Sequence, residues 1–476
     1  MSALQLRTVA AIALLCTLVV LGSGLHDGGD WADASSVLAA QRRPVTIDAP
    51  GFGATDTSDD TGDAGSDGGE APAEETQTRD DGASTGGEAP AATTPSDEEG
   101  GDGGSGPGGD RDTDDADEPT PTKIRHVFLI VLAGHGFDAT FGAGSPATYL
   151  NGTLRPKGTL LSGYRSLGRA GLADALAMIG GQPTNADTRA DCSVYREIPP
   201  TSAPSRSGEI TADGCVFPNT VTTIADQLSA SRRSWKAYVE DLDRGPAPSP
   251  GVAPKVSCRH PGSNAADDTL SARPGDGYAT RRNPFVYYHS LLDLGDCDAN
   301  DGALSALEAD LRSARDTPNL AYIAPNLCND GTESPCVDGS PGGLAAADAF
   351  LATWVPKILA SPAYRSDGLL IVAFAGDVTP PADATAPPDP ATPTTNGALL
   401  IARYAQAGGT NGTAYDPYSL LRSLEDLFAL RPLARAATAS SFTPTVLAGA
   451  SVTPPSDDAF QSPREERDAA LQDHAG

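Results

Sequence analysis

The sequence predicts an α/β fold: a three-layer sandwich with a mostly parallel central sheet and helices on both faces. One observation is a set of short apolar runs, such as His126–Leu132 and Leu369–Phe374, which are typical of strands buried on both faces. The other is that segments with apolar residues at helical spacing, such as Gly171–Gly180 and Ala345–Leu359, lie between these runs. Strands that alternate with helices along a chain build this architecture.

The remaining elements continue the same alternation. In sheets of this kind, ligands bind at the carboxyl ends of the strands, so chemistry is expected just after His126–Leu132. The other expected strands are Trp235–Val239, Leu320–Ile323 and Ala398–Ala402, and the other expected helices are Thr220–Leu228 (with Thr220 or Thr222 as N-cap), Leu304–Ala314 and Tyr418–Leu430.

The chain of 476 residues divides by composition into four parts. Residues 1–25 contain one apolar run, Thr8–Leu21, which fits a signal peptide or an uncleaved signal anchor. Residues 26–121 are rich in Gly, Asp, Pro and Thr, so a disordered linker is expected, either a stalk above a membrane or a solubilising spacer. The folded domain is expected over residues 122–436, and residues 437–476 are expected to form a disordered tail.

The formal charge of −30 is concentrated in the linker. Pro44–Thr120 holds 22 acidic residues against two arginines, which gives −20 for that stretch. The rest of the chain is only mildly acidic and has no basic patch. Nucleic acid is therefore excluded as a partner, because nothing is available to neutralise its phosphates.

Six of the seven cysteines lie in the expected domain, and Cys16 lies in the apolar N-terminal run. An even number of cysteines in an exported domain predicts three disulfides. A metal site is the alternative, but no CxxC spacing supports it. The sequence leaves the pairing open; pairing in sequential order closes the shortest loops and is the simplest expectation: Cys192 with Cys215, Cys258 with Cys297, and Cys328 with Cys336.

An ordered series of motifs extends from Lys123 to Pro432. Over this stretch the chain resembles the bacterial phosphoesterase family that includes phospholipases C and acid phosphatases, within the alkaline-phosphatase-like superfamily. The segments that carry the resemblance are Ile124–Val127 followed by Phe137-Asp138 and Phe141-Gly142, then Leu176–Gln182, Tyr278–Phe285, Pro325–Gly331, Asp367–Ile371 and Tyr418–Phe428.

The resemblance implies divalent metal ions held by carboxylates and histidines, and a Ser or Thr nucleophile near the first strand. Metal ions offset the negative charge that phosphoryl transfer spreads over oxygens. The first motif of the family reads Glu-Asn-x-Ser/Thr. Here it reads Ala133, Gly134, His135, Gly136, so the ligand and the nucleophile are both missing.

Four further motifs have lost reactive side chains. Gly-His-x-Ser-Leu-x-Asn-Tyr is replaced by Gly168–Ala175, with Arg169 at the His position and Gly171 at the Ser position. Of the reactive side chains in His-Asp-Gly-His, only Asp330 survives. The remaining positions without a ligand side chain are Thr332 in that motif, Ala375 and Gly376 in place of Asp-Glu, and Pro417 in place of a His.

Five separated losses predict a domain that uses no metal cofactor and no longer hydrolyses phosphoesters. Clustered carboxylates without a metal would repel one another, so small neutral residues are the more stable replacement. The sequence therefore predicts a cell-surface pseudoenzyme or binding module, secreted or membrane-anchored through its N-terminal segment.

Two alternatives stay open. One is an active metal-dependent phosphatase or phospholipase C with a rearranged site. The other is a metal-free protein that binds a phosphorylated or anionic ligand, with Arg169 and Asp330 as candidate binding residues, because an arginine can hold such an anion without chemistry. Arg169 could instead form an ion pair with Asp330 or Asp174. His135, His260 and His289 are expected to be structural, and Ser145 and Ser166 have no recognisable base.

Overall fold

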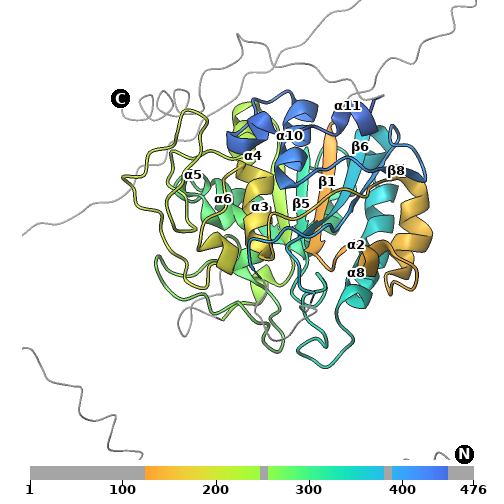
Figure 1. Cartoon of the computed structure of the whole chain (residues 1–476), viewed down its shortest axis with the longest axis horizontal. Helices are drawn as coiled ribbons and strands as arrows, with labels where there is room; N and C mark the ends of the chain where they lie inside the picture. The colour runs from red at the N-terminus through yellow and green to blue at the C-terminus, as the bar shows by residue number, and fades with distance from the viewer. Residues whose placement is uncertain (1–123, 247–255, 380–388, 449–476) are drawn as a thin grey trace, which may run out of the picture. The chain divides into compact units, whose positions relative to one another are not determined.

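The computed structural model describes residues 124–246, 256–379 and 389–448 (Figure 1). The predicted signal segment, the acidic linker and residues 449–476 of the predicted tail lie outside the described residues.

One eight-stranded sheet forms the centre of the domain, in the order β4-β3-β5-β1-β6-β7-β2-β8. The five strands from β4 to β6 in this order run parallel to one another, β7 is antiparallel to both β6 and β2, and β8 is parallel to β2. The predicted mostly parallel sheet is therefore confirmed. The strands are β1 (His126–Ala133), β2 (Thr159–Leu161), β3 (Trp235–Val239), β4 (Asp301–Ala303), β5 (Leu320–Ala324), β6 (Gly368–Ala375), β7 (Ala398–Ala402) and β8 (Gly409–Asn411).

Helices cover both faces of this sheet, as predicted (Figure 1). Alternate residues of β1 point to opposite sides: Val127, Leu129 and Val131 belong to one apolar core, and Phe128, Ile130 and Leu132 to the other. The first core includes residues of α3 (Gly171–Gly180), α4 (Ile224–Ala230) and α10 (Pro417–Phe428), and the second includes residues of α2 (Phe137–Phe141), α7 (Leu307–Asp310) and α8 (Leu344–Ala360).

Shorter elements connect these layers. The other α-helices are α5 (His289–Leu292), α6 (Asp296–Asn300), α9 (Pro362–Asp367) and α11 (Thr443–Val446), and a π-helix spans Leu150–Leu154. Short 3-10 helices occur at Arg155–Lys157, Thr188–Ala190, Leu242–Arg244, Thr280–Arg282, Pro284–Tyr287, Leu304–Ala306 and Ala434–Thr438.

Two predicted helices are shorter than expected. α4 is capped by Thr223, not by Thr220 or Thr222, because Thr223 and Asp226 form a reciprocal capping box. The helix predicted at Leu304–Ala314 consists of a 3-10 turn followed by α7, which ends at Asp310. Beyond it, Ser313 accepts hydrogen bonds from the backbone N–H groups of Asp316 and Thr317, a turn that competes with helix.

The folded domain extends beyond the boundary predicted at Ala436. Phe442 and Leu447 are fully buried in the first core. The Phe442 N–H donates to Ser423 Oγ of α10 at 2.9 Å. Residues 437–448 are thus part of the domain, since two large apolar side chains anchor a segment that is otherwise rich in Ser, Thr and Ala.

The three disulfides have the expected sequential pairing: Cys192–Cys215, Cys258–Cys297 and Cys328–Cys336. Disulfides of this kind persist in oxidising compartments, which indicates a location outside the cytoplasm. Among the helices of the described ranges, none has the length and apolar character needed to cross a membrane.

Candidate functional site

The candidate site lies at the carboxyl ends of β1 and β6. The register of these strands places Ala133 directly opposite Ala375, and both are buried. The Ala133 N–H donates to the backbone carbonyl of Asp330 at 2.9 Å, which brings the loop after β5 to the same point. Three segments at which the resemblance implies metal ligands therefore meet here, and two of them contribute only methyl groups.

Three glycines allow the surrounding backbones to approach closely. A Cβ on Gly134 would lie 2.1 Å from the Gly376 carbonyl oxygen. Gly376 has φ 68°, and a Cβ there would lie 2.5 Å from the Arg169 carbonyl oxygen. A Cβ on Gly171 would lie 2.8 Å from Arg282 Nη1. These distances are far below van der Waals contact, so side chains at these positions require the backbone or the arginine to move.

Asn396 joins two of the closing segments. Its Oδ1 accepts a hydrogen bond from the Gly136 N–H at 3.1 Å, and its Nδ2 donates to the Gly376 carbonyl oxygen at 2.8 Å. The residue is fully buried, just before β7. Asn396 belongs to none of the motifs in the sequence, and only the fold brings it to the position where the resemblance implies the nucleophile.

Asp330 is paired with Arg282. Arg282 Nε lies 2.5 Å from Asp330 Oδ2, although its N–H is not aligned for a hydrogen bond, and Nη2 donates to Thr332 Oγ1 at 2.7 Å. Thr332 in turn donates its N–H and its hydroxyl to the same carboxylate. Burial raises the pKa of Asp330, and the Arg282 guanidinium opposes that increase. The sequence had not singled out Arg282.

Arg169 has a different partner from those predicted. Its Nη1 lies 2.8 Å from Asp377 Oδ2, and its Nη2 donates to the Thr379 carbonyl oxygen. The alternative of an ion pair with Asp330 or Asp174 is wrong, because the Asp377 N–H donates to the Arg169 carbonyl oxygen and so fixes these two residues side by side.

Asp174 is also committed to the backbone. Its carboxylate accepts the Leu167 N–H at 2.7 Å and the Gly376 N–H at 2.8 Å, and the residue is fully buried. Burial raises its pKa to about 8, although the two backbone hydrogen bonds favour the charged form. Asp174 thus holds the turn around Gly376 in place.

His135 lies half-buried between the Asp330 loop and Asp377. Burial lowers its pKa, while contacts with the Gly331 backbone and Asp377 act in the opposite direction. Its Nε2 is buried and has no hydrogen-bond partner within the described part of the chain. Burial thus disfavours a charged imidazolium at this position.

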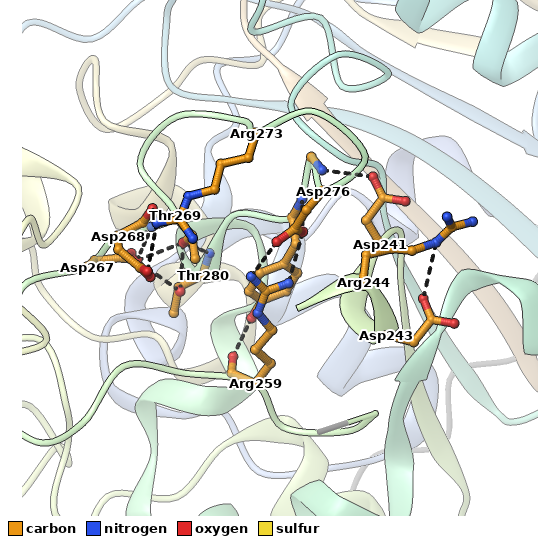
Figure 2. A network of polar contacts seen from close by, with 12 residues as sticks. Asp241, Asp243, Arg244, Arg259, Asp267, Asp268, Thr269, Arg273, Asp276 and Thr280 are labelled. Atoms are coloured by element: carbon orange, nitrogen blue, oxygen red, sulfur yellow. Dashed lines mark hydrogen bonds and ion pairs between the residues drawn. The ribbon is translucent and has the colours of Figure 1, made fainter. Parts of the chain in front are cut away.

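A polar network lies around Arg259, Asp276 and Asp241 (Figure 2). The Arg259 guanidinium makes two hydrogen bonds to the Asp276 carboxylate, at 2.9 and 2.6 Å. Asp241, which follows β3 closely, accepts the Gly277 N–H at 3.0 Å and Asn326 Nδ2 at 2.7 Å. The network therefore ties the 256–280 segment to the loop that carries Asp330.

A model of the phosphoesterase family matches residues 130–431. The chain belongs to the phosphoesterase family. This membership confirms the resemblance inferred from the motifs, and it rests on the family model. No curated protein matches the chain.

Solved structures similar to this phosphoesterase-family chain include an alkaline phosphatase superfamily protein from Vibrio parahaemolyticus, with 14% identity, TM-score 0.39, and coverage of 68% of this chain and 71% of that chain. Another is a phosphonate monoester hydrolase from Silicibacter pomeroyi, with 12% identity, TM-score 0.36, and coverage of 70% of this chain and 78% of that chain. A third is the soluble domain of a lipooligosaccharide phosphoethanolamine transferase A from Neisseria meningitidis, with 10% identity, TM-score 0.31, and coverage of 64% of this chain and 88% of that chain.

The residues of this phosphoesterase-family site do not fit a divalent metal ion. Within residues 124–246, 256–379 and 389–448, one close group of three potential ligand atoms occurs, formed by Cys258, Cys297 and Asp301. Both cysteines are in a disulfide and offer no thiolate. At the site itself, Asp330 is paired with Arg282, and Pro417 occupies the first turn of α10.

The other polar residues considered in the sequence have structural partners. His260 stacks on Tyr195, and His289 contacts Glu197 and Asp293. Ser145 Oγ donates to the Thr140 carbonyl oxygen, and Ser166 exchanges hydrogen bonds with the Thr394 backbone. Among the described residues, neither serine makes a hydrogen bond to a carboxylate or an imidazole that could act as its base.

Proposed function

We propose that this phosphoesterase-family domain has lost metal binding and ester hydrolysis and acts as a pseudoenzyme or binding module outside the cytoplasm. The observation that carries the proposal is the closure between Gly134 and Gly376, where a Cβ would lie 2.1 Å from a carbonyl oxygen. The Asn that the resemblance implies at this position has no room. The motif has therefore lost its reactive side chains, and the backbone of Gly376 now occupies the space that a side chain at position 134 would need.

The charges of the site support the same proposal. Two carboxylates of the site, Asp330 and Asp377, are each paired with an arginine. A metal ion would have to displace these guanidinium groups, which are held by further hydrogen bonds to Thr332 and Thr379. Protein cations thus balance the charge that a metal ion would balance in an active relative.

The three disulfides and the apolar N-terminal run support export. We propose that the N-terminal segment anchors the domain at the cell membrane or directs its secretion, with the acidic segment as a spacer.

Metal analysis and hydrolysis assays test the proposal. The full chain is produced under oxidising conditions and assayed with p-nitrophenyl phosphate and bis(p-nitrophenyl) phosphate, with added Zn²⁺, Mn²⁺ or Ca²⁺ and with a chelator. We expect no stoichiometric bound metal and no chelator-sensitive turnover. Chelator-sensitive turnover would instead establish the rearranged-enzyme alternative.

One observation favours anion binding as a second candidate function. The side chain of Arg169 is 22% exposed, against 6% for Arg282, so an anion could reach it from solvent.

Inorganic phosphate or sulfate should then raise the thermal unfolding temperature of the wild type, and the increase should vanish in Arg169→Ala. Arg435→Ala, which removes a more exposed arginine paired with Glu209, is the matched control. An equal increase in both variants would remove this candidate.

A further inference from the structure

Asp330 is a buried carboxylate that needs a counter-charge. Its relative exposure is 0%, and it lies in the loop that follows β5. Thr332 supplies a backbone N–H at 2.6 Å and a hydroxyl at 3.0 Å. Two neutral donors do not offset the loss of hydration of a buried charge, which amounts to several kcal/mol in proteins. The cation beside Asp330 therefore decides whether this arrangement is stable.

Arg282 provides that cation from a segment 48 residues away in the sequence, since its Nε lies 2.5 Å from Asp330 Oδ2. Its side chain is 6% exposed, so solvent screens the pair very little. The guanidinium also donates to Thr332 Oγ1, so Arg282, Asp330 and Thr332 form one connected group. Arg169 pairs with Asp377 instead, and Arg281, whose charge also acts on Asp330, lies 4.0 Å from the Asp191 carboxylate.

The space for this guanidinium depends on Gly171. A Cβ at that position would lie 2.8 Å from Arg282 Nη1. The resemblance implies a Ser at position 171 and makes Asp330 the one retained reactive side chain of its motif. The small residue and the arginine therefore fit together as a pair: the glycine leaves room for a side chain that reaches the retained carboxylate.

We infer that Arg282 is a built-in cation at Asp330, and that Asp330 and Thr332 form a latent cation site which accepts a free guanidinium-type cation once the Arg282 side chain is removed. The inference deepens the proposed loss of metal binding, because it states what balances the remaining carboxylate. It also explains how the domain keeps a buried acid without a metal ion.

Chemical rescue tests the latent site. Thermal unfolding of the full chain is measured for the wild type and for Arg282→Ala, with methylguanidinium chloride at low millimolar concentration and with equal concentrations of sodium chloride or urea. Arg282→Ala should unfold at a lower temperature than the wild type, and methylguanidinium alone should raise that temperature. The matched control is Arg169→Ala, which removes the more exposed arginine of the Arg169–Asp377 pair. Absence of rescue, or equal rescue of the control, overturns the inference.

A double-mutant cycle tests the charge balance separately. Arg282→Met leaves a buried, uncompensated carboxylate, whereas Arg282→Met/Asp330→Asn leaves no charge. We expect the double variant to unfold at a higher temperature than Arg282→Met alone, because removing both partners is less harmful than removing one. If the decreases in unfolding temperature caused by Arg282→Met and by Asp330→Asn simply add in the double variant, the inference is contradicted.

A further comparison applies if the Arg282 variants do not fold. Asp330→Asn should then lower the unfolding temperature more than Asp377→Asn, whose arginine remains partly solvated; the reverse order overturns the inference. These outcomes are separable from the proposed function. Metal-dependent hydrolysis by the wild type would end the pseudoenzyme proposal, whereas additivity in the cycle would end only the role of Arg282.

Discussion

Gly134 and Gly376 approach each other so closely that a Cβ on Gly134 would lie 2.1 Å from the Gly376 carbonyl oxygen. The contact joins the ends of β1 and β6, where the Gly134 N–H also donates to the Ala375 carbonyl oxygen at 3.0 Å. The absence of a side chain at position 134 is therefore a condition of the packing, which leads to the first prediction.

Gly134→Ala is expected to destabilise the domain by about 1–3 kcal/mol, the usual range for overpacking a close-packed interior. The measurement is urea-induced unfolding of the wild type and the variant. Gly152→Ala is the matched control, because a Cβ there meets nothing within 4 Å. A Gly134→Ala variant as stable as the control would show that the two strand ends can separate freely.

Asn396→Ala is expected to lower the free energy of unfolding by about 2–4 kcal/mol, since it leaves the partly buried Gly136 N–H and the buried Gly376 carbonyl without their partners. Asn396→Asp should also destabilise, because it keeps the acceptor for Gly136 but places a carboxylate oxygen against the Gly376 carbonyl. Chemical unfolding of both variants checks this. If Asn396→Asp matches the wild type, the bridge to Gly376 contributes nothing.

The stability of the domain should depend on pH through Glu425. Burial raises the pKa of this carboxyl group to about 9, while in the unfolded chain it is near its ordinary value of 4.5. The folded state therefore binds the proton more tightly, so the stabilising contribution is largest below pH 4.5 and is lost as the pH rises towards 9. The slope from this one group is about −1.4 kcal/mol per pH unit within that window.

Glu425→Gln should remove this slope while keeping a carbonyl oxygen that can accept the Leu433 N–H, which donates to Glu425 Oε1 at 2.7 Å. Free energies of unfolding measured between pH 5 and pH 9 provide the comparison. Parallel curves for the wild type and the variant would mean that Glu425 is ionised in the folded state at neutral pH.

The Arg259–Asp276 pair in the polar network should contribute substantially to stability (Figure 2). Both side chains are largely buried, and the guanidinium also lies 4.6 Å from the ring centroid of Tyr278. Arg259→Ala should cost about 2–3 kcal/mol, and Arg259→Lys should recover only part of this, because lysine cannot bind a carboxylate through two parallel hydrogen bonds.

The same network contains the matched control for this prediction. Arg273 pairs with Asp268, and both side chains are exposed. Arg273→Ala should therefore change the free energy of unfolding by less than about 1 kcal/mol, as exposed ion pairs usually do. Equal losses in Arg259→Ala and Arg273→Ala would contradict the structural role assigned to the Arg259–Asp276 pair.

The sequence by itself determined the layers of the fold and the identity of the residues at the motif positions that the resemblance implies. Apolar runs such as His126–Leu132 and helical spacing such as that of Gly171–Gly180 are local patterns, so they predicted β1 and α3 correctly. Residue identities alone established that Ala133, Gly136 and Ala375 carry no ligand or nucleophile.

Only the tertiary structure decided how the site is closed and how its charges are paired. Arg282 rather than Arg169 neutralises Asp330, and Asn396 reaches Gly136 from 260 residues away. The physical reason is that hydrogen bonds and ion pairs act over a few ångströms in space, whereas sequence patterns report on neighbours along the chain. Residues such as Arg282 and Asn396 acquire their roles when separate loops meet at the ends of parallel strands.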